Sequence, residues 1–221
     1  MKRVVAYLLA SVIAGSAQAG AWPRGDGNVF LSFGRTSSVT APPEVLKGRD
    51  LSLFFEYGLT DDLTAGIDLS TGSNGQTATA LAFARHPILQ DFTDHPVAVT
   101  LALGIEDLEG GVSVPLLRAG LSWGRGLEKG WLTIDTFYTT APNSQRTDWK
   151  SDVTLGRRFG DHVKGIVQFQ TSVSTSGALY SKFAPSGVVT VVEGLDVEIG
   201  AIQPIAGDDE IQLKIGVWMS F

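Results

Sequence analysis

Several features are missing from this sequence, and each absence excludes a class of structure or chemistry. The chain of 221 residues contains no cysteine, so it cannot form disulfides, thiolate metal sites or a cysteine nucleophile. Charged residues make up only 18%, and the net charge of −6 argues against a nucleic-acid partner, which requires a basic face. After residue 19 the apolar runs extend over only a few residues, so no membrane-spanning helix of about 20 residues is expected.

Glycine and aliphatic residues are abundant instead. The 26 glycines exceed the usual share of about 7%, and 43% of the residues are hydrophobic. This composition argues against disorder, because aliphatic residues are plentiful and charge is low. The chain therefore needs a fold that accommodates many apolar residues, few charges and many glycines.

The first 19 residues have the pattern of a secretory signal peptide. Lys2 and Arg3 form the positive n-region, a short apolar run follows, and a small-residue cleavage motif ends at Ala19. The apolar run is too short to cross a bilayer as an anchor. We therefore expect export, cleavage after Ala19, a periplasmic N-terminal segment at 20–27 and a structural domain at 28–221.

Alternation of apolar and polar residues dominates the rest of the chain. In the final segment, Ile211 to Phe221, every second residue is apolar. Alternation with period two is typical of a strand with two unlike faces, and no segment has convincing helical periodicity. The sequence therefore predicts an all-β fold. The predicted strands are 28–36, 49–58, 62–71, 77–86, 96–106, 115–124, 131–140, 148–159, 162–173, 179–191, 195–205 and 210–221.

An exported all-β chain can form a soluble sandwich or a membrane barrel. The polar faces carry mainly small residues with isolated charges, as a barrel interior does, whereas a sandwich would expose many charges. Aromatic residues lie near segment ends on the apolar face, where a girdle meets the two lipid–water interfaces. We therefore predict a transmembrane antiparallel up-and-down β-barrel of about twelve strands, with ten or fourteen as alternatives. The girdle residues are Tyr57, Trp123, Tyr138, Trp149 and Phe159.

An even number of strands places both termini on one side, which is the periplasm in bacterial single-chain barrels. Three features of the sequence fit the predicted barrel poorly. Region 86–95 is long for a periplasmic turn, and Arg157 falls on the lipid face near a strand end. Trp131 and Trp218 fall on the lumen face, where a β-bulge could have shifted the register.

Over its whole length the chain resembles bacterial outer-membrane β-barrel proteins, through its signal peptide, its alternating segments and its C-terminal IQLKIGVWMSF. YGLTDDLTAGIDLS (57–70) and SKFAPS (181–186) also resemble the outer-membrane family named for the phenol meta-cleavage pathway, whose members are regarded as small-molecule channels. The first resemblance implies a C-terminal signal that the barrel-assembly machinery reads, formed by Ile215, Val217, Met219 and Phe221.

Some outer-membrane barrels are enzymes, and an enzyme would need catalytic groups in its sequence. His86, His95 and His162 fall at expected periplasmic turns, whereas histidines of barrel hydrolases lie, by resemblance, near the outer face. A Ser–His pair needs hydrogen-bond contact, and no motif indicates one. The acidic groups at 106–109 and 207–210 lack the spacing of an EF-hand loop. We expect no catalytic residue, no metal and no cofactor.

Projecting the polar face of each strand inward predicts fourteen charged residues in the lumen. Most of the acids come from the first seven strands, and most of the bases from the last five. These charges could either create a field across a narrow pore or pair with one another and fill the lumen. The acids are Asp50, Glu56, Asp68, Glu106, Asp135, Asp152, Asp196 and Glu198, and the bases are Arg118, Lys150, Arg158, Lys164, Lys182 and Lys214.

The expected function is passive passage of small solutes through a narrow lumen in the bacterial outer membrane, with outer-membrane lipid around the barrel. One alternative is a non-conducting structural or envelope-interaction barrel with a filled lumen. Another is an enzyme acting on outer-membrane lipids, which would need a polar triad in the outer half of the barrel.

Overall fold

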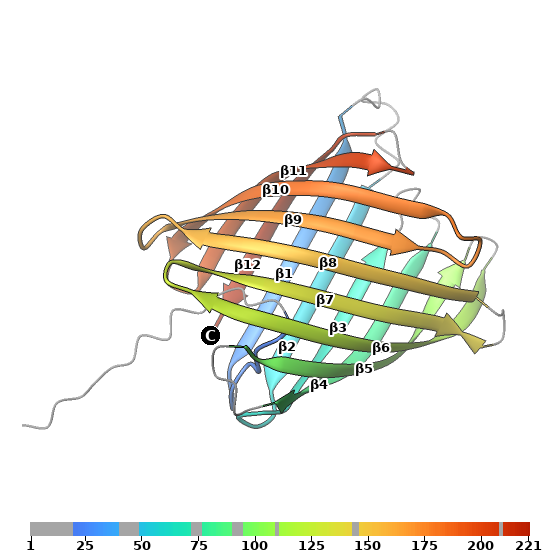
Figure 1. Ribbon diagram of the computed structural model, residues 1–221, viewed down its shortest axis with the longest axis horizontal. Helices are drawn as coiled ribbons and strands as arrows, with labels where there is room; N and C mark the ends of the chain where they lie inside the picture. The colour runs from blue at the N-terminus through green and yellow to red at the C-terminus, as the bar shows by residue number, and fades with distance from the viewer. Residues whose placement is uncertain are drawn as a thin grey trace, which may run out of the picture.

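The computed structural model describes residues 20–39, 49–71, 77–89, 95–108, 111–142, 146–207 and 210–221. Within them, twelve antiparallel strands run up and down around a closed barrel, which confirms the predicted fold class (Figure 1). The predicted signal peptide lies outside the described residues. The strands are β1 (Val29–Ser38), β2 (Arg49–Gly58), β3 (Thr64–Thr71), β4 (Ala78–Leu89), β5 (Val97–Leu108), β6 (Val112–Leu127), β7 (Gly130–Ala141), β8 (Arg146–Arg158), β9 (Val163–Val173), β10 (Leu179–Val192), β11 (Leu195–Ala206) and β12 (Gln212–Ser220).

The first and last strands close the barrel. β1 pairs with β12 from Phe30 opposite Ser220 to Ser38 opposite Gln212. Beyond this ladder, the Val29 N–H donates to the Phe221 carbonyl at 2.7 Å, and the Phe221 N–H donates to the Val29 carbonyl at 3.2 Å. Each described strand therefore has a partner on both sides, as a sheet in hydrocarbon requires. The end of the barrel that carries Val29 and Phe221 is called the terminal end below, and the opposite end is called the distal end.

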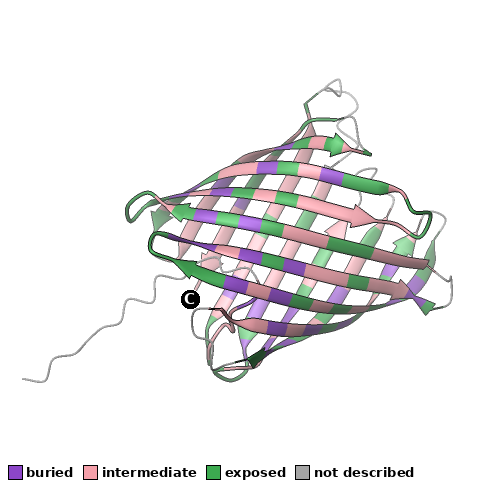
Figure 2. Cartoon of the chain, viewed as in Figure 1, coloured by how far each residue is buried: buried purple, intermediate pink, exposed green. Residues whose placement is uncertain are grey.

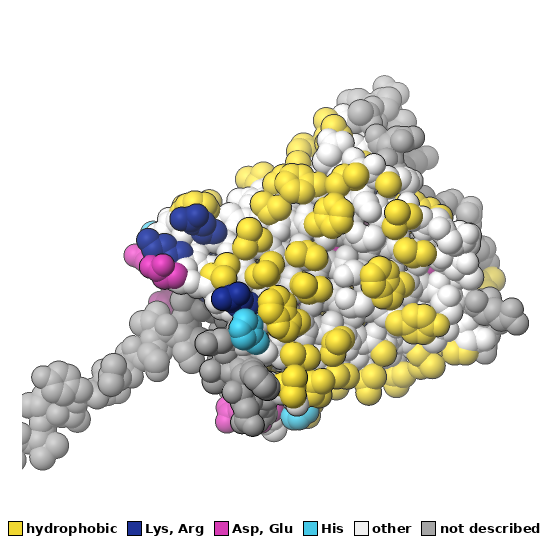
Figure 3. Space-filling model, viewed as in Figure 1, with side chains coloured by type: hydrophobic (Ala, Val, Ile, Leu, Met, Phe, Trp, Pro, Cys, Tyr) yellow, Lys and Arg dark blue, Asp and Glu magenta, His cyan; other side chains and the backbone are white. Residues whose placement is uncertain are grey.

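Buried and exposed residues alternate along the strands (Figure 2). On β5, Ala98, Thr100 and Ala102 are buried in the barrel, whereas Leu101 and Leu103 are more than half exposed on its outer surface. Apolar side chains cover most of the face in Figure 3, and the charged side chains visible there gather near the terminal end. An apolar outer surface of this extent is suited to lipid rather than water.

No helix in the described part of the chain is long and apolar enough to cross a membrane.

The aromatic residues predicted for the girdle lie on the outer surface near the two ends. Tyr138 and Trp149 are direct partners across β7 and β8 toward the distal end. Tyr57 lies near the terminal end of β2, and Phe159 directly follows β8. The remaining girdle residue, Trp123, stacks on His95 near that same end. Arg157, which the sequence places on the lipid face, is exposed there with its guanidinium 5.6 Å from the Phe159 ring centre. The C-terminal residues Ile215, Val217, Met219 and Phe221 alternate with the inward-facing residues of β12.

The suspected long turn at 86–95 is shorter than the sequence indicated. β4 continues to Leu89, three residues past its predicted end at His86. A register shift between Pro87 and Leu89 in the β4–β5 pair accompanies this extension. Residues 90–94 of this region lie outside the described residues.

The interpretation of Trp131 and Trp218 as residues displaced by a bulge is wrong. The ladders that contain them have regular register, and the bulges lie in β10 and near the end of β4 instead. Both indole rings face the barrel interior, where Trp131 is buried with Ile166 and Val188, and Trp218 packs against this group. Large apolar residues therefore belong to the inner wall at the terminal end.

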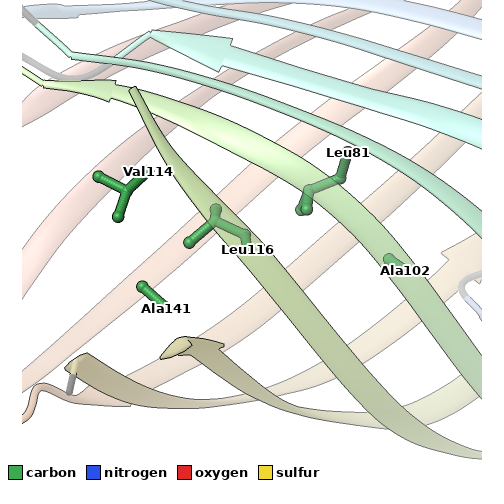
Figure 4. Close-up of a cluster of buried hydrophobic side chains, with 5 residues drawn as sticks. All are labelled: Leu81, Ala102, Val114, Leu116 and Ala141. Atoms are coloured by element: carbon green, nitrogen blue, oxygen red, sulfur yellow. The ribbon is translucent and has the colours of Figure 1, made fainter. Parts of the chain in front are cut away.

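A second apolar cluster lines the inner wall formed by β4 to β7 (Figure 4). Phe83 and Leu108 pack against it. On β4 this reverses the usual size pattern, because Leu81 faces inward while Ala80 and Ala82 lie on the other face. The inner wall is therefore a mosaic of polar and apolar sectors. The cluster consists of Leu81, Ala102, Val114, Leu116 and Ala141.

Gly156 on β8 provides a test of packing at the terminal end. A methyl group at Gly156 would lie 2.2 Å from Cζ2 of Trp131, whereas a methyl group at Gly187 would meet nothing within 4 Å. We expect Gly156→Ala to destabilise the barrel by ~1–3 kcal/mol through overpacking, and Gly187→Ala to change little. Urea unfolding in detergent micelles, followed by tryptophan fluorescence, measures both. Equal stability of the two variants would contradict the tight packing around Trp131.

Candidate functional site

The lumen contains a buried three-residue ion-pair cluster near the terminal end. Glu56 on β2 is 1% exposed and forms an ion pair with Arg85 of β4, in which Arg85 Nη2 lies 2.6 Å from Glu56 Oε1. Its other carboxylate oxygen accepts a hydrogen bond from Arg24, which precedes the first strand. The Arg24 guanidinium also lies 4.7 Å from the centre of the Phe30 ring. One carboxylate thus holds two cations in a site shielded from solvent.

Residues 20–24, which precede β1, lie inside the barrel. Ala21 is fully buried, and Trp22 packs against the cluster of Trp131, Ile166 and Val188. The wall accommodates this segment because a methyl group at Gly124 would lie 2.6 Å from the Trp22 ring. The Arg24 N–H donates to Thr64 Oγ1 at 2.9 Å, which fixes the backbone beside β3. Residues 20–24 therefore narrow the lumen at the terminal end.

A cavity of about 250 Å³ remains next to this constriction. Aromatic rings of Phe30, Phe54, Trp131 and Trp218 contribute to its lining. The pair of Lys214 and Glu198 also contributes, with Nζ to Oε1 at 2.8 Å. The cavity thus offers both apolar and charged surface to a small solute.

Ion pairs also line the rest of the lumen, from Lys164 with Asp196 near the terminal end to Arg146 with Glu106 at the distal end. Arg118 contacts Asp68 at 3.0 Å, Lys150 contacts Asp152 at 2.8 Å, and Lys164 contacts Asp196 at 2.6 Å. Arg146 binds both Glu106 and Asp148 at the start of β8. Several of these partners lie on different strands, so the charges tie the wall together across the lumen.

The structure pairs eight of the fourteen predicted lumen residues with one another: Asp68 with Arg118, Lys150 with Asp152, Lys164 with Asp196, and Glu198 with Lys214. Asp50 accepts a hydrogen bond from Thr36 at 3.3 Å. Arg158 lies with its guanidinium 5.5 Å from the Trp131 ring centre. Lys182 lies on β10 opposite Gln170 and Pro204. Asp135 is buried opposite Asp152 across β7 and β8.

Sequence reasoning missed the partners of Glu56 and Glu106. Arg24 lies outside any alternating segment, so no strand parity could assign it to the lumen. Arg85 shares its face with Leu81 and Phe83. These two large apolar residues suggest a lipid-facing side, because the opposite face of β4 carries alanines at 78, 80, 82 and 84. Arg146 lies just before the predicted start of its strand at 148. The acids of the first seven strands therefore have cationic partners that strand parity did not reveal: Arg24 and Arg85 for Glu56, and Arg146 of β8 for Glu106.

The three histidines are spread over the terminal end. His86 is exposed on β4, His95 stacks on Trp123, and the His162 carbonyl accepts the Thr190 N–H at 2.8 Å in the β8–β9 turn. Among the described residues, no group of three or more His, Asp or Glu side chains has the arrangement of a metal site.

Three solved structures share this architecture. The KdgM porin superposes with a TM-score of 0.67 at 7% identity, covering 87% of this chain and 99% of that chain. The chain shares the barrel fold of this porin. The NanC porin gives 0.61 at 11% identity, covering 86% and 98%. An outer membrane channel from Pseudomonas putida F1 gives 0.58 at 12% identity, covering 93% and 98%.

No family model and no curated protein matches the sequence. The resemblance to the family named for phenol meta-cleavage therefore stays a prediction.

The Glu56 cluster can be tested by truncation. Glu56→Ala leaves the guanidinium groups of Arg24 and Arg85 buried without their carboxylate, so we expect a loss of ~3–5 kcal/mol in unfolding free energy. Asp68→Ala is the matched control, because its pair with Arg118 is partly exposed and should contribute only ~0–1 kcal/mol. Urea midpoints in detergent micelles compare the two. A similar loss of unfolding free energy in both variants would contradict a larger contribution of the Glu56 cluster to stability.

Proposed function

We propose that the protein is a narrow passive channel for small solutes in the bacterial outer membrane. The observation that carries this proposal is the lumen itself: a closed barrel encloses a band of paired charges and a cavity of about 250 Å³. The likeness to the KdgM and NanC porins supports it at the level of the fold. In this proposal the terminal end faces the periplasm, because four of its five turns are short.

The constriction limits which solutes can pass. Residues 20–24 and the buried tryptophans occupy the terminal end, so only small molecules have room beside them. Acids and bases alternate around the passage and neutralise each other locally, as in Lys164 with Asp196. A solute therefore meets paired charges and aromatic surface rather than a strong field of one sign. This lining suits small polar or amphiphilic solutes.

A barrel without conductance is the second candidate, and one observation favours it. Ala21 is fully buried in the lumen and Trp22 packs on the inner wall, so the same segment that narrows a channel could also close it. In that case the barrel would serve the envelope as a structural or interaction protein.

Assembly and maturation are part of the same proposal. Cleavage after Ala19 would release a mature chain that begins at Gly20. Ile215, Val217, Met219 and Phe221 would be read by the barrel-assembly machinery, since β12 presents them on one face. Outer-membrane lipid would then contact the apolar outer surface.

Planar-bilayer recordings test the channel. We expect small, stable conductance steps from the purified protein, and a shift toward cation selectivity in Lys150→Glu and Lys214→Glu, because both lysines face the lumen. Lys129→Glu is the matched control, since Lys129 lies exposed in the turn between β6 and β7. A silent wild-type protein would favour the closed barrel. Unchanged selectivity in a conducting protein would remove both lysines from the solute path.

Cleavage is tested by the mass of the protein. The barrel isolated from outer membranes should have the intact mass of residues 20–221, and its first tryptic peptide should be Gly20–Arg24. An intact mass that includes residues 1–19 would contradict cleavage.

A further inference from the structure

Two aspartates on neighbouring strands, Asp135 buried and Asp152 partly buried, each have one carboxylate oxygen shielded from solvent. Asp135 on β7 and Asp152 on β8 are direct partners in the ladder and face the lumen together. Asp135 is 7% exposed. Among the described residues, Oδ1 of Asp135 and Oδ1 of Asp152 have no hydrogen bond of regular geometry, and the neutral hydroxyls of Ser122 and Thr133 are the donors near Asp135. Burial of a carboxylate oxygen without a charged donor costs free energy, so a further cationic donor would stabilise this pair.

The cations nearby are already engaged. Lys150 contacts the other oxygen of Asp152, Oδ2, at 2.8 Å. Arg85 lies close enough to Asp135 to attract it, but its Nη2 atom is 2.6 Å from Glu56. The hydroxyls of Ser122 and Thr133 lie beside the Asp135 carboxylate. Neither lysine nor arginine therefore forms a regular hydrogen bond to the two Oδ1 atoms, which can still accept from a further cationic donor.

Gly20 lies directly against this acceptor site. A methyl group at its Cα would lie 2.9 Å from Asp135 Oδ1 and 2.7 Å from Ser122 Oγ. The full burial of Ala21 fixes the backbone at this position. Only glycine leaves the space beside Asp135 unfilled, and the Gly20 nitrogen is two bonds from this methyl position.

We propose that Asp135, Asp152 and Ser122 form a binding site for a primary ammonium, and that its occupant is the α-ammonium of Gly20 in the mature chain. This inference rests on the proposed cleavage after Ala19 and not on conductance. Hydrolysis of the Ala19–Gly20 peptide bond by water leaves a carboxylate on Ala19 and a protonated amine on Gly20. The nitrogen then changes from a neutral amide with one donor into a cation with three.

The consequence is that maturation anchors the constriction. Before cleavage the Gly20 nitrogen brings no charge to the aspartate pair. After cleavage, charge-assisted hydrogen bonds hold residues 20–24 in the lumen from their first atom, in addition to the Arg24–Glu56 contact. Removal of the signal peptide thereby adds a charged anchor to the segment that narrows the lumen.

Reactivity of the α-amine tests the site. The folded protein is treated briefly with succinimidyl acetate, and acetylation of the tryptic peptide 20–24 is followed by mass spectrometry. We expect Asp135→Asn to label about tenfold faster than wild type, since a hydrogen bond to a charged group protects by about that factor. Asp68→Asn, which removes another lumen acid, is the control and should label at the wild-type rate.

An extended chain keeps the test valid even if Asp135→Asn fails to fold. Inserting Ser-Gly between Ala19 and Gly20 leaves every lumen side chain intact and moves the ammonium away from the aspartates. We expect fast labelling of this N-terminus and a lower unfolding temperature than wild type. In the extended chain, Asp135→Asn should have no further effect on labelling.

Three results would overturn the proposal: equal labelling of the wild-type and extended chains, equal acceleration by Asp68→Asn and Asp135→Asn, or a wild-type N-terminus as reactive when folded as in urea. Intact mass separates these from a failure of cleavage, because a chain that still carries residues 1–19 has no Gly20 amine. Bilayer recordings on the same samples report conductance independently.

Discussion

Backbone hydrogen bonding in hydrocarbon is the constraint on which the rest of the structure depends. No water is present in the bilayer core to satisfy an unpaired N–H or C=O, so a sheet can span it only as a closed ring. The pairing of β1 with β12 meets this demand. Closure in turn gives each strand one face toward lipid and one toward the lumen, and the low charge of the sequence follows from the apolar outer face.

Inside the ring, charge and volume compete. Burying a charge is tolerable only when a partner and further hydrogen bonds compensate its lost hydration. The lumen meets this requirement with pairs such as Lys164 with Asp196 and with the Arg24–Glu56–Arg85 cluster. Each pair also occupies space that a solute could use. The balance between a stable wall and an open passage is therefore set by how many charges are paired across the lumen rather than exposed to water in it.

The sequence predicted the strands well because alternation is local. A strand such as β12 shows its two faces in its own nine residues, whatever the rest of the chain does. The same local alternation assigned charged residues to the lumen face. Eight of them form four ion pairs there, one of which is Lys164 with Asp196.

What the sequence could not predict depends on contacts between distant segments. Residues 20–24 have no periodicity, and only the wall around them, including Gly124, creates their place in the lumen. Strand parity did not assign Arg85 to the lumen, because β4 carries its larger apolar residues inward and alanines outward. The end of β4 was missed because its last residues pair through a register shift. Trp131 was misjudged because a buried tryptophan in a lumen is favourable only where other apolar side chains meet it.

The hydrogen bonds between Val29 and Phe221 join residues from opposite ends of the polypeptide. A contact of this sequence separation cannot form early, since its two halves leave the ribosome at opposite ends of synthesis. A chain that lacks its last strand would keep two open edges and could not be accommodated in lipid. The seam therefore forms only in a chain that has been synthesised through β12, and no shorter product can close the ring.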